Sequence, residues 1–125
     1  MRKMPKYAKT HEWYEDIGNG KVRIGISKHA AHELSDVVFV ELPEVGKKLA
    51  DKQSLCVLES VKAVADAYSP AGTVVEVNDK LKDQAGLVTQ DPEGAGWLAV
   101  VQLDDPKALD SYLTEADYLK TIEAH

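Results

Sequence analysis

Lys62 is the residue of this 125-residue chain whose surroundings most favour chemistry. It stands in the segment Leu58-Glu59-Ser60-Val61-Lys62-Ala63-Val64-Ala65-Asp66. A predicted strand at 55–59 enters this segment and another at 65–68 leaves it, so Lys62 should fall at or beside the tip of a tight hairpin. An enzyme that acylates a lysine amine needs a side chain that projects from a fixed backbone, and a hairpin tip provides both. An ordinary solvated lysine at a turn fits the same spacing.

Other reactive side chains give weaker signals. Cys56 is the only cysteine and lies in an apolar stretch, so we expect a small buried hydrophobe rather than a nucleophile, no internal disulfide, and a reducing compartment. His29 and His32 are three residues apart and could share a helix face, as metal ligands sometimes do. No third ligand accompanies them, so we expect surface residues and no metal site.

Short strands should position the Lys62 hairpin. Apolar and polar residues alternate over 21–26, after the turn-forming pair Asn19-Gly20, which indicates a half-buried strand. The β-branched and aromatic run at 36–42 predicts a strand buried on both faces. Two further strands are expected at 73–77 and near 97–103.

Two helices should accompany these strands. Ser27 is a suitable N-cap for a short helix that ends at Leu34, and Thr114 is suitable for a terminal helix containing Tyr118, Leu119 and Ile122. The pattern predicts a mainly β fold, a flattened barrel or sandwich of antiparallel strands with a short internal helix and a C-terminal helix. We expect a single domain over 1–125, with a core at about 6–103 and a helical region at about 106–123.

Composition narrows the classes of partner. The net charge is -6, and charged residues of both signs make up 29% of the chain, without a basic block that would recruit nucleic acid or an anionic membrane. The apolar runs are too short to cross a bilayer, and residues 1–5 lack the apolar core of a signal peptide. We expect a soluble protein, monomeric, without nucleic-acid or membrane partners.

Residues 59–63 resemble the lipoylation motif of the glycine cleavage system H proteins, which are small lipoyl carriers. The resemblance continues in the same order along roughly residues 6 to 122. Its members are Thr10-His11-Glu12-Trp13, Ile24-Gly25-Ile26-Ser27, the run from Asp36 to Gly46, Ser69-Pro70, Gly72, Val74-Val75-Glu76-Val77-Asn78, Leu87-Val88, Asp91-Pro92, Gly94 and Gly96-Trp97-Leu98.

This resemblance implies that Lys62 carries lipoic acid as N6-lipoyllysine and that the chain is a carrier, not an enzyme. The dithiolane of the arm is strained and opens readily. A pyridoxal-phosphate glycine decarboxylase would transfer the aminomethyl group of glycine to one sulfur of the arm. A tetrahydrofolate-dependent aminomethyltransferase would remove it, and a flavin- and NAD-dependent dihydrolipoyl dehydrogenase would reoxidise the dithiol. Members of the family work in bacterial cytoplasm and in the mitochondrial matrix, so the resemblance implies the cytoplasm for a bacterial chain and the matrix for a eukaryotic one.

The resemblance also implies supporting residues. The family positions that dock the loaded arm correspond to Thr10, Glu12 and Asp66, whose carboxylates would attract the cationic amine of the cargo. Ordinary solvated carboxylates are the alternative for Glu12 and Asp66. Glu59 is expected to be recognised by the lipoyl-attaching enzyme, because it lies on the approach strand of the motif.

Three alternatives remain. A biotin carrier would place Met on both sides of the lysine, where this chain has Val61 and Ala63. A lipoyl domain of a 2-oxo-acid dehydrogenase commonly has Asp before the lysine and lacks the terminal helix. A relay protein that passes its lipoyl group on, or regulates another enzyme, would keep the same fold, and residues 27–35 depart enough from the family pattern to leave this open.

Overall fold

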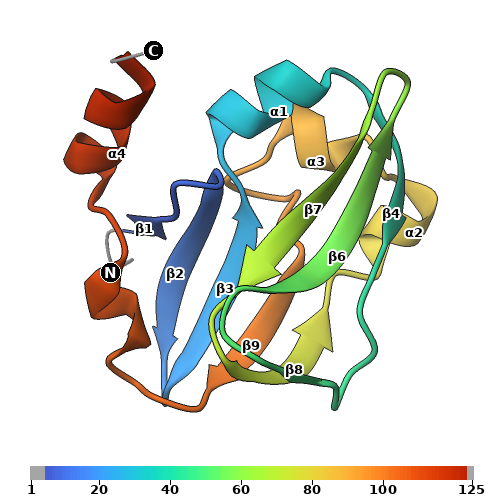
Figure 1. The fold of residues 1–125 in the computed structure, drawn as a ribbon. Helices are drawn as coiled ribbons and strands as arrows, with labels where there is room; N and C mark the ends of the chain where they lie inside the picture. Colours follow the sequence, from blue (N-terminus) through green and yellow to red (C-terminus); the bar gives the residue numbers. More distant parts are fainter. Residues whose placement is uncertain (1–4, 124–125) are drawn as a thin grey trace.

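The chain folds into two antiparallel β-sheets that pack around a shared core (Figure 1). The computed structural model describes residues 5–123. The prediction that residues 1–5 are not a signal peptide therefore falls mostly outside the described residues. The larger sheet has the order β1-β2-β3-β9-β8-β5 and the smaller one β4-β6-β7. Their strands are β1 (Lys6–Tyr7), β2 (Glu12–Gly18), β3 (Lys21–Ile26), β4 (Val37–Glu41), β5 (Lys48–Leu49), β6 (Gln53–Ser60), β7 (Val64–Ser69), β8 (Gly72–Val77) and β9 (Ala99–Leu103).

Helices occupy the connections and the C-terminal end. They are α1 (Lys28–Leu34), α2 (Lys80–Asp83), α3 (Leu87–Gln90), the 3-10 helix η1 (Ala108–Ser111) and α4 (Glu115–Glu123). The predicted mainly β fold with a short internal helix and a terminal helix is confirmed. The sequence did not predict α2 and α3, because four residues are too few to display a helical period.

The core lies between the two sheets, and each sheet contributes side chains to it. Ile24 and Val101 come from the larger sheet, Leu58 and Ala67 come from the smaller one, and all four side chains are fully buried. Val101 pairs with Val22 of β3 on one side and with Val74 of β8 on the other. Strand β9 is therefore hydrogen-bonded along both edges and lies in the middle of its sheet.

The predicted double burial of the strand at 36–42 is wrong. β4 is an edge strand that pairs only with β6, and the side chains of Val38 and Phe39 are 60% and 52% exposed. The register shifts between Val37 and Phe39, a bulge that turns both Val38 and Phe39 outward. Val37 and Val40 of this run are buried in the core, and Leu42 is partly buried against it.

Turn and cap predictions are confirmed. Asn19 and Gly20 both have positive φ, +57° and +75°, as the tight turn between β2 and β3 requires. The Ser27 hydroxyl accepts a hydrogen bond from the Ala30 N–H and caps α1. The Thr114 hydroxyl accepts one from the Asp117 N–H at the start of α4.

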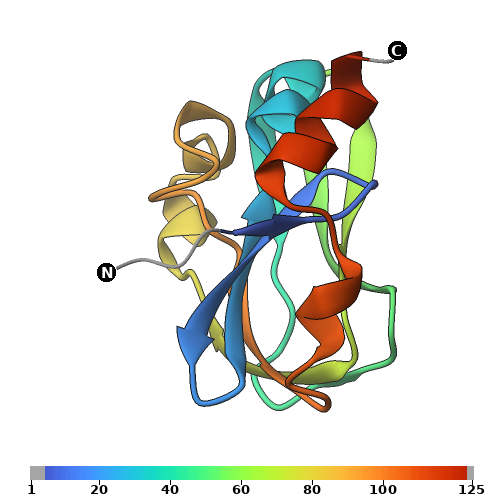
Figure 2. The ribbon, with the colours of Figure 1, turned by 90° about the vertical axis from the view of Figure 1, so that its left-hand side faces the viewer.

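The C-terminal segment packs on the side of the molecule that β1 borders, as Figure 2 shows for η1 and α4. Tyr118 of α4 stacks on Tyr7 with ring centroids 4.6 Å apart, and both join Trp13 in a second apolar cluster. The Tyr118 hydroxyl lies 2.7 Å from Ser27 Oγ and 2.6 Å from His11 Nδ1. One tyrosine thus links α4 to the cap of α1 and to the turn between β1 and β2.

Candidate modification site on the β6–β7 hairpin

Lys62 lies in the turn of the β6–β7 hairpin, as the sequence predicted. The last paired residues are Glu59 and Val64, so residues 60–63 form the loop. The side chains of Val61, Lys62 and Ala63 are exposed. The hairpin ends beside α1 at the top of the molecule, where its tip extends past the sheet (Figure 1). The Lys62 amine is therefore accessible to another protein.

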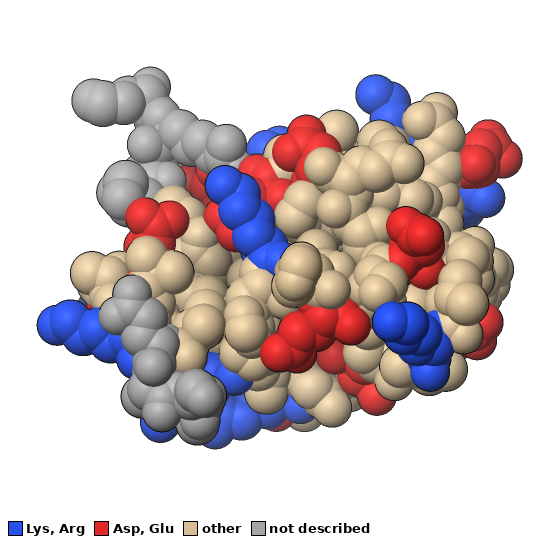
Figure 3. All heavy atoms as spheres, turned by 90° about the horizontal axis from the view of Figure 1, so that it is seen from above, with Lys and Arg blue, Asp and Glu red and all other residues tan. Residues whose placement is uncertain are grey.

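The outer face of the smaller sheet carries both apolar and acidic side chains next to this tip. Phe39, Glu59 and Val64 stand side by side across the three strands, and Glu41, Val57 and Asp66 form the next row. Glu59 is exposed, as expected for a residue that a docking enzyme would contact. Seen from above, acidic and basic side chains are interspersed, without one dominant charge (Figure 3).

Cys56 is buried beneath this face, as predicted. Burial, with smaller contributions from the charges of Asp66, Glu12 and Glu41, raises the pKa of its thiol to about 12. The thiol is therefore protonated at neutral pH and cannot act as a nucleophile. The three carboxylates come from β7, β2 and β4.

Glu12 is a buried carboxylate rather than a solvated one, with 1% of its surface exposed. Burial raises its pKa, while hydrogen bonds from the Thr10 hydroxyl, the Tyr68 backbone N–H and the Tyr14 hydroxyl lower it. The effect of burial is the larger one, so the pKa of Glu12 is raised. Through these contacts Glu12 joins β2 to β7, and Thr10 lies between its carboxylate and the solvent side.

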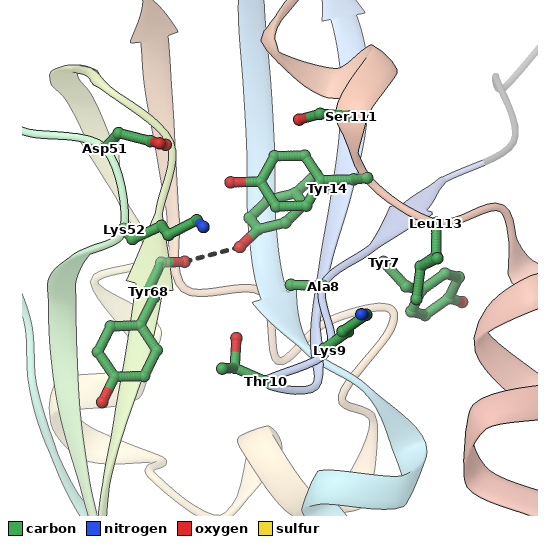
Figure 4. A pocket seen from close by; sticks show the side chains of 11 residues that line it. Tyr7, Ala8, Lys9, Thr10, Tyr14, Asp51, Lys52, Tyr68, Ser111 and Leu113 are labelled. Atoms are coloured by element: carbon green, nitrogen blue, oxygen red, sulfur yellow. Dashed lines mark hydrogen bonds between the residues drawn. The ribbon is translucent and has the colours of Figure 1, made fainter. Parts of the chain in front are cut away.

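A cavity of about 540 Å³ opens beside Thr10 (Figure 4). Tyr14 crosses one wall and donates a 3.0 Å hydrogen bond to the backbone carbonyl of Tyr68 on the opposite wall. Lys52 extends into the cavity from the turn before β6, and Lys9 contributes a second ammonium group. Burial raises the pKa of Tyr14, with a smaller contribution from Glu12, so the hydroxyl keeps its proton and remains a donor.

The structure brings Thr10 and Glu12 into direct contact, and it places Asp66 on the same strand as Tyr68, which lines the cavity. Asp66 itself is exposed and accepts a 2.8 Å hydrogen bond from Ser54 Oγ. Asp66 is four residues beyond Lys62, about 13 Å along an extended strand. An arm on Lys62 would therefore have to fold back along β7 to reach the cavity.

Of the residues that line this cavity, sequence reasoning identified only Thr10, and among those it missed are Tyr14, Lys52 and Tyr68. They come from β2, from a turn and from β7, so only the packing of the two sheets brings them together. Their spacing along the chain contains no common pattern. No signal in a single sequence could have identified them as a group.

The histidines occupy a separate region. His29 Nε2 lies 2.9 Å from Glu33 Oε1, and its ring packs on that of His11 with centroids 4.7 Å apart. Within residues 5–123, no cluster of three or more His, Cys, Asp or Glu side chains is arranged to hold a metal ion. None of the helices in that range is long and apolar enough to cross a membrane.

Comparisons with known proteins agree on one family. The profile of the glycine cleavage H-protein family matches residues 5–125. The glycine cleavage system H protein of Vibrio vulnificus strain YJ016 is 46% identical over 124 residues, which is 98% of each chain. That of Coprothermobacter proteolyticus is 45% identical over 118 residues, covering 94% of this chain and 93% of that one. The crystal structure of the H protein from Mycobacterium marinum superposes with a TM-score of 0.85 at 37% identity, over 95% of this chain and 96% of that one.

Proposed function

Because this chain belongs to the glycine cleavage H-protein family, we propose that it is a lipoyl carrier of glycine cleavage whose attachment site is Lys62. The observation that carries the assignment is the exposed Lys62 in the turn of the β6–β7 hairpin, within Glu59-Ser60-Val61-Lys62-Ala63. A carrier of this kind does not itself catalyse the reactions. Its partners are the glycine decarboxylase, the aminomethyltransferase, the dihydrolipoyl dehydrogenase and the enzyme that attaches the arm.

The residues present fit a lipoyl arm. Lys62 offers an accessible amine for the amide bond, and the hairpin fixes the backbone from which the arm extends. When bound, lipoic acid supplies a dithiolane that accepts the aminomethyl group with ring opening and is later reoxidised. The cavity beside Thr10 is large enough to hold a small cargo, and sheltering that cargo from bulk water is the second requirement of a carrier.

Thr10, Glu12 and Asp66 are the residues we assign to docking of the loaded arm. Thr10 lines the cavity and is exposed, and Asp66 offers an exposed carboxylate to a cationic amine. Glu12 acts indirectly, through Thr10, because its carboxylate is buried and hydrogen-bonded to the Thr10 hydroxyl. The Thr10 hydroxyl donates its hydrogen to the Glu12 carboxylate, which leaves the Thr10 oxygen as a hydrogen-bond acceptor for the cationic cargo.

Attachment at Lys62 is tested by intact mass. The wild-type protein and the variants Lys62→Arg and Lys48→Arg are incubated with a lipoate-attaching enzyme, lipoate and ATP. Lys48 is an exposed lysine on the edge strand β5 and serves as the matched control. We expect the wild type and Lys48→Arg to gain one lipoyl group and Lys62→Arg to gain none. A lipoyl-sized increase in Lys62→Arg would refute the assignment.

The docking role is tested on the aminomethyl-loaded protein. Thr10→Ala and Asp66→Asn should each shorten the lifetime of the loaded form in water, since the first removes a hydroxyl and the second a negative charge from the arm's path. Asp79→Asn, a change of the same kind at the start of α2, should leave the lifetime unchanged. Equal release of ammonia from wild type, Thr10→Ala and Asp66→Asn would contradict the docking role while leaving the attachment site intact.

The carrier role is separated from the relay alternative by reconstitution. The lipoylated wild-type protein should support glycine-dependent NADH formation with the decarboxylase, the aminomethyltransferase and the dehydrogenase. A lipoylated sample that fails this assay would favour the relay.

A further inference from the structure

The loop that contains Lys62 is closed by one side chain, that of Ser60. Its hydroxyl accepts hydrogen bonds from the Ala63 N–H at 3.0 Å and from the Lys62 N–H at 3.3 Å, and it donates one to the Ala63 carbonyl at 3.1 Å. The Ser60 N–H also donates to the Ala63 carbonyl at 2.8 Å. A hydroxyl has one donor and two acceptor sites. All three are used here within four residues.

Packing contributes little to the same loop. Val61 is 75% exposed, and the side chains of Lys62 and Ala63 are exposed as well. The second anchor is a backbone hydrogen bond, from the Val61 N–H to the Asp36 carbonyl at 3.3 Å. It holds the entry to the loop against the connection between α1 and β4. The direction in which the Lys62 side chain leaves the backbone therefore depends mainly on the Ser60 hydroxyl.

We propose that Ser60 is a positioning residue for the modification of Lys62, holding the loop in the form that the lipoyl-attaching enzyme accepts. This inference rests on the proposed function. When only a fraction of a protein is in the binding-competent form, its apparent affinity falls by that fraction, while turnover of the bound complex is unchanged. Loss of the Ser60 hydroxyl therefore raises KM for the carrier and leaves kcat alone.

The test compares Ser60→Ala, Ser60→Thr and Thr89→Ala as substrates of a lipoate-attaching enzyme. Ser60→Ala should raise KM at least about fivefold with kcat unchanged, because fivefold is the factor that a single hydrogen bond represents and the variant loses three. Ser60→Thr keeps a hydroxyl at the same position and should restore KM to within about twofold of wild type. Thr89→Ala is the control, since the Thr89 hydroxyl donates to a backbone carbonyl three residues away but lies on α3.

Amide hydrogen exchange gives a readout independent of the enzyme. In Ser60→Ala the amides of Lys62 and Ala63 should exchange faster, while those of β9 keep the wild-type rate. The same KM for Ser60→Ala and wild type would overturn the inference, and so would a raised KM accompanied by faster exchange throughout β9, which indicates unfolding. A wild-type protein that gains no lipoyl group, or a Lys62→Arg variant that gains one, contradicts the proposed function instead.

Discussion

At the scale of single residues, Glu12 shows how burial changes the meaning of a charged side chain. Its carboxylate is 1% exposed and has three hydrogen-bond donors around it, yet burial still raises its pKa above the ordinary value of 4.5. The hydrogen bonds compensate only part of the cost of taking the charge out of water. The folded protein therefore holds the proton of Glu12 more tightly than the unfolded chain does.

This difference predicts a pH-dependent effect of Glu12→Gln on stability. Below pH 4.5 the carboxyl is protonated in both states and resembles the amide. As the pH rises through the raised pKa, the unfolded chain has already released its proton, so the wild type loses stability relative to the variant. Urea denaturation at pH 4 and at pH 8 should show the advantage of Glu12→Gln increasing with pH. The same difference at both pH values, or a similar trend in the exposed Glu44→Gln, would count against this explanation.

Glu59 should matter for recognition rather than for folding. It is exposed and stands between Phe39 and Val64 on the outer face of the smaller sheet. A hydrogen bond to a charged partner contributes about 1.5–3 kcal/mol, so Glu59→Gln should lower kcat/KM for lipoylation by about tenfold or more. Glu41→Gln, in the next row of the same face, is the matched control. The melting temperatures of both variants should equal that of wild type, and unchanged kinetics for Glu59→Gln would remove its role.

At the scale of elements, the junction between α1 and β4 contains a strained residue. Ser35 follows α1 with φ +64° and ψ −137°, a conformation that glycine adopts far more easily than serine. The next residue, Asp36, supplies the carbonyl that holds Val61 in the Lys62 hairpin. The strained residue therefore lies next to the residue that anchors the Lys62 hairpin.

Replacing Ser35 by glycine should relieve this strain. We expect Ser35→Gly to raise the free energy of unfolding by about 1 kcal/mol, measured by urea denaturation, because the relieved strain exceeds the entropy that glycine loses on folding. Ala116→Gly in α4 provides the comparison, since glycine introduced at an ordinary helical position should destabilise, by up to about 1 kcal/mol. If Ser35→Gly also lowers the free energy of unfolding, the positive φ of Ser35 does not strain the native protein.

Elements could be predicted from the sequence where local signals decide them. The cap at Ser27 and the Asn19-Gly20 turn lie within a few residues of the elements they bound, so both were predicted. β2 was not, because Glu12, Trp13, Tyr14 and Glu15 are all buried and the alternation of a half-buried strand is lost. The exposure of Val38 and the burial of Glu12 depend on which strands become neighbours, which a single sequence does not state.

At the scale of the whole molecule, β9 is the strand on which the larger sheet depends. It joins β3 to β8, although it follows both in the chain, so the sheet is complete only when the last strand is in place. Contacts between residues far apart in the sequence form slowly, because the long stretch of chain between them must close into a loop first. Folding should therefore depend on residues 99–103 more than on any local turn.

Amide hydrogen exchange should reflect this arrangement. We expect the slowest exchange in β9 and in the facing residues of β3, where Val22, Val101 and Ala99 are fully buried and paired. Residues 60–63 and the short edge strands β1 and β5 should exchange much faster. Protection that is equal in β9 and β5 would show that the larger sheet opens as a whole rather than from its edges.

The pairing of Tyr7 with Leu113, through hydrogen bonds of 2.7 and 2.8 Å, joins segments from opposite ends of the chain. Both lie across the molecule from the Lys62 hairpin (Figure 1). A linker attached to β1 or to the segment around Leu113 would therefore lie across the molecule from Lys62. The protein could be immobilised on an electrode or a bead through such a linker with the Lys62 hairpin facing the solution, and the loading of the proposed arm could then be followed on the surface.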